Sequence, residues 1–140
     1  MIVKVCGMRC GQNIREIEAA GVDWIGLICY EHSPRFVSST PDYLPVRTTR
    51  VGVFVNATLD YIRTRAMELG LTHLQLHGEE SSELCRILQA DGFHVIKAFQ
   101  VKDMHRSGKC IHMSLIVLIS FSIRQRLAME APVSVLIGIC

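Results

Sequence analysis

The chain has 140 residues, of which 49% are apolar, and a formal net charge of +2. This composition is typical of one globular domain with a buried core, and it excludes a disordered or fibrous chain. The basic residues form no stripe, and the apolar runs are shorter than the roughly 20 residues that span a bilayer, so we expect no nucleic-acid or membrane partner.

An apolar strand pattern begins at the N-terminus where an export signal would have a basic segment, so we expect a cytoplasmic protein. None of the six cysteines lies in a C-x-x-C pair, which favours reduced thiols over a disulfide framework. The histidines share no ligand spacing. We therefore expect no metal site.

Five short apolar runs, each ending in polar residues or glycine, alternate with segments of helical spacing. They begin near residues 2, 23, 50, 73 and 94. This alternation predicts parallel strands with right-handed crossovers. The polar groups that follow the runs indicate where such a sheet binds its ligand.

Three predicted helices each end just before a glycine placed as a C-terminal cap, at Gly21, Gly70 and Gly92. Ser81 or Ser82 is the expected N-cap of the third helix, and Asn56 is the expected N-cap of the second. Residues 41–45 have the weakest helical pattern and fit a single turn.

Two architectures suit this pattern: an open doubly wound sheet, favoured by the chain length, and a (β/α)8 barrel, which takes at least about 200 residues. Residues 1–103 form the repeating part. Residues 104–140 are expected to be a divergent tail without an independent domain. Within it, residues 111–123 fit a strand or a buried helix, and residues 133–139 fit a final strand.

Two residues are the first candidates for chemistry. Cys6 ends the first run, where a thiolate stabilised by a cation such as Arg9 acts as base or nucleophile; a buried core thiol is the alternative. Arg35 follows Pro34 in a stiffened loop and suits bidentate capture of a carboxylate or phosphate; a solvated surface arginine is the alternative.

Two further candidates come from the fourth and fifth runs. His77 ends the fourth run and is interpreted as a pocket wall or proton donor, or as a hydrogen-bonded structural histidine. Lys97 lies inside the fifth run, where its charge must reach a pocket or the rim of a barrel.

Five segments together carry a family resemblance: residues 4–8, 26–27 with 33–37, 52–56, 75–80 and 96–99. In this order and spacing they resemble phosphoribosylanthranilate isomerase of tryptophan biosynthesis, over residues 1 to about 101. The resemblance implies an α/β chain with about five βα units of a parallel (β/α)8 TIM barrel. The implied reaction converts N-(5-phosphoribosyl)anthranilate to 1-(2-carboxyphenylamino)-1-deoxyribulose 5-phosphate, an Amadori rearrangement without cofactor or metal.

The resemblance also implies roles for single residues. Cys6 is the general base that takes the proton from ribose C2, Arg35 faces the anthranilate carboxylate, and His77 lines the pocket. We group Lys97 with Arg35 and His77 as substrate-binding residues for a small phosphorylated substrate. The implied oligomeric state, monomer or homo-oligomer, stays open.

The family's general acid, an aspartate after the sixth strand, and its glycine-rich phosphate loops have no counterpart here. Asp103 belongs to the loop after the fifth strand and is not given the acid role. We therefore expect very weak or absent activity. Two alternatives stay open: a non-catalytic partial barrel that self-associates or pairs with another chain, and a flavodoxin-like sheet with its own ligand.

A shifted reading frame accounts for the tail. In this frame the third base of each codon is read together with the first two bases of the next codon. The junction of the Met129 and Glu130 codons must then encode glycine. The following junctions permit Gly-Thr-Gly and then Phe-Asp-Trp, which resembles the family's phosphate loop. We expect residues from roughly 102–110 onward to be a frameshifted translation that ends early.

Overall fold

The computed structural model describes residues 2–101 and 115–121. Several predictions lie outside these ranges: the frameshifted reading, the position of Asp103, the strand over 133–139, and most of the tail assigned to 104–140.

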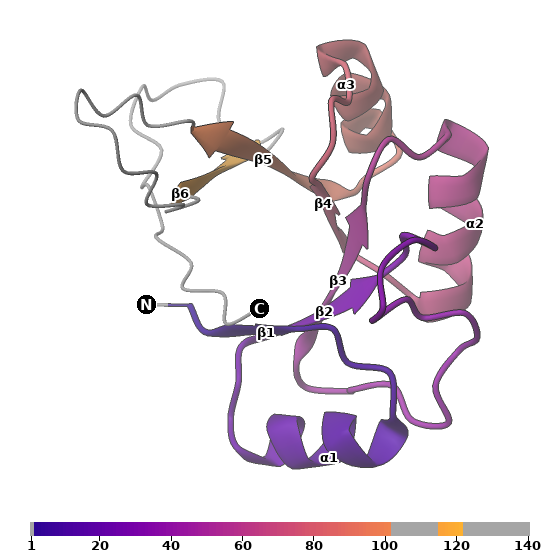
Figure 1. The fold of residues 1–140 in the computed structure, drawn as a ribbon, viewed down its shortest axis with the longest axis vertical. Helices are drawn as coiled ribbons and strands as arrows, with labels where there is room; N and C mark the ends of the chain where they lie inside the picture. The colour runs from indigo at the N-terminus through magenta and orange to yellow at the C-terminus, as the bar shows by residue number, and fades with distance from the viewer. Residues whose placement is uncertain (1, 102–114, 122–140) are drawn as a thin grey trace, which may run out of the picture.

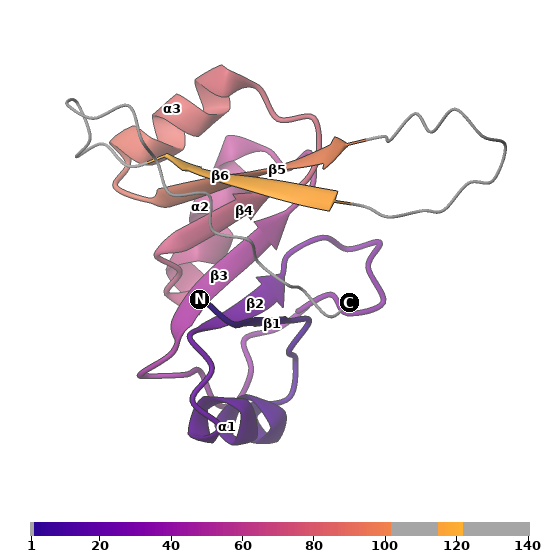
Figure 2. The same cartoon turned by 90° about the vertical axis from the view of Figure 1, so that its left-hand side faces the viewer.

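One sheet contains all six described strands, which are β1 (Lys4–Cys6), β2 (Trp24–Ile28), β3 (Thr49–Phe54), β4 (His73–Leu76), β5 (His94–Val101) and β6 (Leu115–Phe121). Strands β1 to β5 are parallel, which confirms the five predicted strands. Strand β6 pairs with β5 antiparallel, as Figure 2 shows. Of the predicted segment 111–123, the structure describes residues 115–121, and these form a strand, which is one of the two alternatives.

The described residues form three helices, α1 (Gly11–Ala19), α2 (Leu59–Leu69) and α3 (Ser82–Ala90). The Ser81 hydroxyl accepts the amide hydrogen of Leu84 at 3.2 Å and caps α3. The Thr58 hydroxyl accepts the amide hydrogen of Tyr61 at 3.3 Å and caps α2. The predicted N-cap role of Asn56 is therefore wrong, because Thr58 is closer to the first helical turn.

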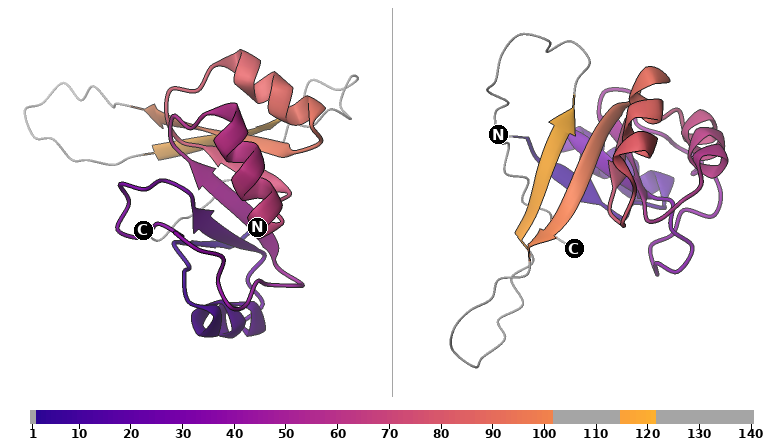
Figure 3. Two further views of the ribbon diagram at one scale, coloured as in Figure 1. Left: turned by 90° about the vertical axis from the view of Figure 1, so that its right-hand side faces the viewer. Right: turned by 90° about the horizontal axis from the view of Figure 1, so that it is seen from above.

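Strand order decides between the two predicted architectures. A doubly wound sheet reverses its strand order and carries helices on both faces. Here each strand neighbours the next in the sequence, and all three helices lie on the outer side of the curved sheet (Figure 1). This is the arrangement of the first strands of a (β/α)8 barrel. Seen from above, β5 and β6 lie side by side with α3 outside β5 (Figure 3).

The connection between β2 and β3 contains no helix in the structure and is held by α1 instead. The buried carboxylate of Glu18 accepts three consecutive amide hydrogens, from Val46 (2.9 Å), Arg47 (2.6 Å) and Thr48 (3.1 Å). The Tyr43 hydroxyl donates to its second oxygen. The Tyr43 and backbone donors lower the pKa of Glu18 to about 2, against the opposing effect of burial.

The main apolar core lies between the sheet and its helices. Side chains that alternate along the strands, such as Ile25, Leu27 and Leu74, pack there against Ile14 and Ile62 of the helices. Since successive strand residues point to opposite faces, the remaining strand positions belong to the inner face of the arc. Several of these inner-face residues are polar, and the candidate site is built from them.

Candidate active site

The Cys6 thiol lies on the inner face of β1, opposite Gly26 of β2. A Cβ atom added to Gly26 would lie 2.2 Å from Cys6 Sγ, so only glycine leaves space for the thiol there. Gly7 follows with φ of +84°, and its amide donates to the Gly26 carbonyl at 2.9 Å. The turn at the end of β1 thus fixes the direction of the Cys6 side chain.

Arg35 meets the end of β1 although it follows β2 in the sequence. The Arg35 amide donates to the Ser33 hydroxyl at 3.2 Å, within a turn that leads the chain back along β2. A Cβ atom on Gly7 would lie 2.5 Å from Arg35 Cδ, so the arginine side chain crosses the Gly7 backbone. The structure therefore brings exposed Arg35 against Gly7, the residue that follows Cys6, and the roles of the two side chains stay predictions.

His77 extends the alternation of β4 by one residue, which places it on the same face as Gln75. Its amide donates to the Phe54 carbonyl at 2.9 Å. Its Nε2 atom is buried and has no hydrogen-bond partner within the described part of the chain. Burial lowers the pKa of His77, and the Lys4 and Lys97 charges add to this effect while Glu80 opposes it. A neutral imidazole with an unpartnered nitrogen is suited to meet a polar ligand atom.

A buried polar contact that the sequence analysis missed joins the two sides of the inner face. The Lys4 ammonium of β1 donates to the side-chain oxygen of Gln75 in β4, and both residues are only 7% exposed. Lysine inside an apolar strand was the signal that drew attention to Lys97, and the same signal applied to Lys4.

Lys97 approaches the site from the other side of the sheet. It pairs in register with Leu76, which faces the helices. The Lys97 ammonium donates to the Glu80 carboxylate at 2.9 Å and to the carbonyl of Gly78. The structure thus brings Lys97 to the turn that contains His77, and a direct contact with substrate stays a prediction. Glu80, which the sequence analysis did not single out, is its principal partner.

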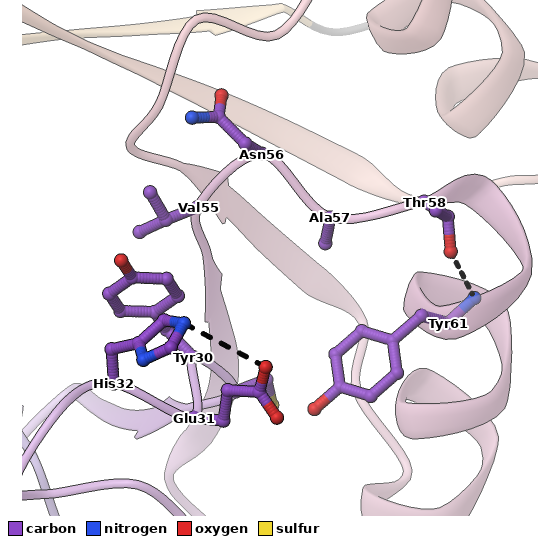
Figure 4. A pocket seen from close by; sticks show the side chains of 9 residues that line it. Tyr30, Glu31, His32, Val55, Asn56, Ala57, Thr58 and Tyr61 are labelled. Atoms are coloured by element: carbon purple, nitrogen blue, oxygen red, sulfur yellow. Dashed lines mark hydrogen bonds and ion pairs between the residues drawn. The ribbon is translucent and has the colours of Figure 1, made fainter.

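A cavity of about 480 Å³ lies between the loop after β2 and the start of α2. Tyr30 and His32 lie on one side of it, and the Tyr61 hydroxyl points towards Glu31 from the other (Figure 4). None of the four predicted site residues lines this cavity. It is separate from the arrangement of Cys6 and Arg35.

The chemistry available at the strand ends is that of a thiol, a guanidinium and a neutral imidazole. In residues 2–101 and 115–121, no group of three or more His, Cys, Asp or Glu residues could hold a metal ion. No helix in this part of the chain is long and apolar enough to cross a membrane. A thiol, a guanidinium and a neutral imidazole are side chains that support proton transfer and anion binding.

Comparison with known proteins identifies the family. The family model described as N-(5'-phosphoribosyl)anthranilate (PRA) isomerase matches residues 3–119. The N-(5'-phosphoribosyl)anthranilate isomerase of Phocaeicola vulgatus is 54% identical over 111 residues, which are 77% of this chain and 54% of the relative. The chain spans about half the length of the curated relatives it matches.

Two solved structures share the fold. Phosphoribosyl anthranilate isomerase in complex with reduced 1-(o-carboxyphenylamino)-1-deoxyribulose 5-phosphate is 36% identical, with a TM-score of 0.65 over 74% of this chain and 56% of that one. Mutually generated monomers of the dimeric enzyme from Thermotoga maritima are 32% identical, with a TM-score of 0.63 and the same shares of each chain. The strand order, the site motifs and the match over residues 3–119 together show that this chain belongs to the phosphoribosylanthranilate isomerase family.

Proposed function

We propose that this chain carries the base and the carboxylate-binding half of a phosphoribosylanthranilate isomerase site. The observation that carries the proposal is the packing at the carboxyl ends of β1 and β2, where Cys6 lies against Gly26 and Arg35 lies against Gly7, the residue after Cys6. The substrate is N-(5-phosphoribosyl)anthranilate, a small phosphorylated molecule. A cytoplasmic setting is part of the proposal and suits the free thiols of the described cysteines.

Each residue acts on a different part of the substrate. Arg35 pairs with the anthranilate carboxylate, and its guanidinium matches the two oxygens of that group. Cys6, as thiolate, removes the proton from ribose C2, which begins the conversion of the aldose to the ketose derivative. The unpartnered His77 Nε2, on the same face of the sheet as Gln75, forms a hydrogen bond with a substrate hydroxyl.

The described residues supply only part of the machinery. Strand β6 has the sequence LIVLISF and carries no acidic side chain at either end. A missing general acid removes a factor of about 10²–10⁴ from the rate. We therefore propose that turnover by this chain is very weak, whereas binding of the anthranilate end is retained.

Binding of reduced 1-(o-carboxyphenylamino)-1-deoxyribulose 5-phosphate to the full chain tests this proposal. Calorimetry is expected to show binding that Arg35→Met weakens about 10- to 100-fold, because a charged hydrogen bond contributes about 1.5–3 kcal/mol. Arg63→Met is the matched control, since Arg63 pairs with Asp91 at the surface. Equal affinity of the Arg35 and Arg63 variants, or no binding at all, would contradict the proposed site.

A second candidate function is a non-catalytic partial barrel that self-associates. It is favoured by the sheet edges, because β1 and β6 each have one strand neighbour within the described residues. Open edges of parallel strands invite pairing with another chain. Sedimentation velocity separates the two candidates: a monomer that binds the product analogue supports the isomerase, and a stable oligomer that binds none supports the partial barrel.

A further inference from the structure

The Glu80 carboxylate is the centre of a buried hydrogen-bond cluster beside His77. One oxygen accepts the amide hydrogen of Asn56 at 2.8 Å, and the other accepts from the Lys97 ammonium at 2.9 Å. The Gly78 amide lies within reach of both oxygens, at 3.1 and 3.0 Å. The Glu80 side chain is 1% exposed and that of Lys97 is 9% exposed. A buried carboxylate with this many donors, one of them charged, is stable as an anion.

Asn56 fixes the same turn from the end of β3. Its backbone has φ of +50°, and its side-chain oxygen accepts the amide hydrogen of Glu79 at 2.7 Å. A Cβ atom on Gly78 would lie 2.4 Å from that oxygen, so the turn packs directly against Asn56. Residues 77–80 are therefore held between the end of β3 and the Lys97 side chain of β5.

Lys97 is fully engaged in this cluster. Besides Glu80 and the Gly78 carbonyl, its ammonium lies 3.4 Å from the carbonyls of Leu76 and Ala98. An ammonium has three hydrogens, and these four carbonyl and carboxylate acceptors are enough to receive them. The register with Leu76 also places Lys97 on the sheet face opposite to Gln75, away from the inner face.

We propose that the Lys97–Glu80 ion pair is a positioning device that holds the 77–80 turn so that the His77 imidazole lies on the inner face. Lys97 is then a positioning residue that acts through Glu80 and not a substrate contact. The inference rests on the proposed function in one respect, which is that a substrate meets His77. The arrangement of the turn itself does not depend on turnover.

The charges around His77 provide a specific signature. Lys4 from β1 and Lys97 from β5 lower the pKa of His77 together with burial, and Glu80 from its own turn raises it. Removing Lys97 should therefore raise the titration midpoint of His77, and removing the Glu80 charge should lower it. Opposite shifts in the two variants would show that the pair lies beside His77, and exchange of the turn amides then shows whether the pair holds the turn.

Nitrogen NMR of the full chain, with the His77 signal assigned from His77→Gln, measures these midpoints. We expect Lys97→Met to raise the midpoint and Glu80→Gln to lower it, because the first removes a positive charge and the second a negative one. Lys97→Arg should bring the midpoint of His77 part of the way back to the wild-type value, because arginine keeps the positive charge. Arg63→Met removes a surface charge and should leave the midpoint unchanged.

Amide exchange of Gly78 and Glu79 reports the position of the turn in the same samples. Both amides donate within the cluster, so Lys97→Met should speed their exchange at least about tenfold relative to amides of α2. Lys97→Met with Glu80→Leu replaces the pair by apolar side chains and keeps the test valid if the single variant unfolds. Unchanged exchange of both amides in the folded double variant, or unchanged His77 midpoints in the two single variants, would overturn the inference. Neither the His77 midpoint nor amide exchange depends on product formation. Failure of this inference can therefore be told apart from failure of the proposed isomerase function.

Discussion

Glu18→Gln should destabilise the fold by removing the anion that holds the helix-free connection between β2 and β3. The variant keeps the shape of the side chain but loses the charge that accepts three amide hydrogens and the Tyr43 hydroxyl. The pKa of Glu18 falls from 4.5 to about 2 in the folded chain. At about 1.4 kcal/mol per unit, this corresponds to about 3 kcal/mol at neutral pH.

The size of this effect has an independent check. Hydrogen bonds to a charged group contribute about 1.5–3 kcal/mol, so we expect Glu18→Gln to cost about 2–3 kcal/mol at pH 7. Urea unfolding followed by the fluorescence of Trp24, the single tryptophan, measures the difference. Glu16→Gln is the matched control, because Glu16 is exposed on the same helix and accepts only from Gln12.

The pH dependence follows from the direction of the shift. A carboxyl whose folded pKa is depressed contributes its full stability above the unfolded value of 4.5 and loses it as the pH falls through 2. The difference between the wild-type chain and Glu18→Gln should therefore shrink between pH 4.5 and 2. A difference under about 0.5 kcal/mol at pH 7, or one that stays constant down to pH 2, would refute this reasoning.

Three further predictions concern other parts of the chain. Gly26→Ala should destabilise the fold by about 1–3 kcal/mol, because the added Cβ atom would lie 2.2 Å from Cys6 Sγ. In urea unfolding, adding Cys6→Ala should recover most of this lost stability, and additive effects of the two substitutions would show that residues 6 and 26 do not touch. Burial lowers the pKa of His73 to about 4, and the stacked His94 adds to this effect. The free energy of unfolding should therefore fall by about 1–2 kcal/mol between pH 6.5 and pH 4, and by less in His73→Phe. An equal fall in the wild-type chain and in His73→Phe would contradict this prediction. The nucleotide sequence over codons 100–140 should regain Gly-Gly-Thr-Gly and Phe-Asp-Trp after a single-base change; if no such change restores them, the frameshift is wrong.

The strands and helices were predictable because their signals are local. Each apolar run and each capping glycine acts within a few residues, and Ser81 caps α3 as expected. The strand order was not predictable from these signals, because composition and periodicity are the same in a doubly wound sheet and in a barrel. Only the pairing of β1 to β5 in chain order separates the two.

The site was predictable where one residue carries the signal, and less so where two distant residues share it. Cys6 and Arg35 were chosen separately, and the packing of Arg35 against the residue after Cys6 depends on Gly7, whose missing side chain admits the arginine. Glu80 was not singled out, because its buried ion pair is with Lys97, 17 residues away in the sequence. Asn56 was misassigned because its partner is the Glu79 amide in another loop and not the start of α2.

Turnover of N-(5-phosphoribosyl)anthranilate, followed by the loss of its fluorescence, tests the central claim most directly. The full chain, its Cys6→Ala variant and the full-length relative from Phocaeicola vulgatus are compared under the same conditions. We predict a rate at least about 10²-fold below that of the relative, and loss of the remaining activity in Cys6→Ala. A rate equal to that of the relative, or residual turnover that Cys6→Ala leaves unchanged, would contradict the claim that this chain carries the base of an incomplete isomerase site.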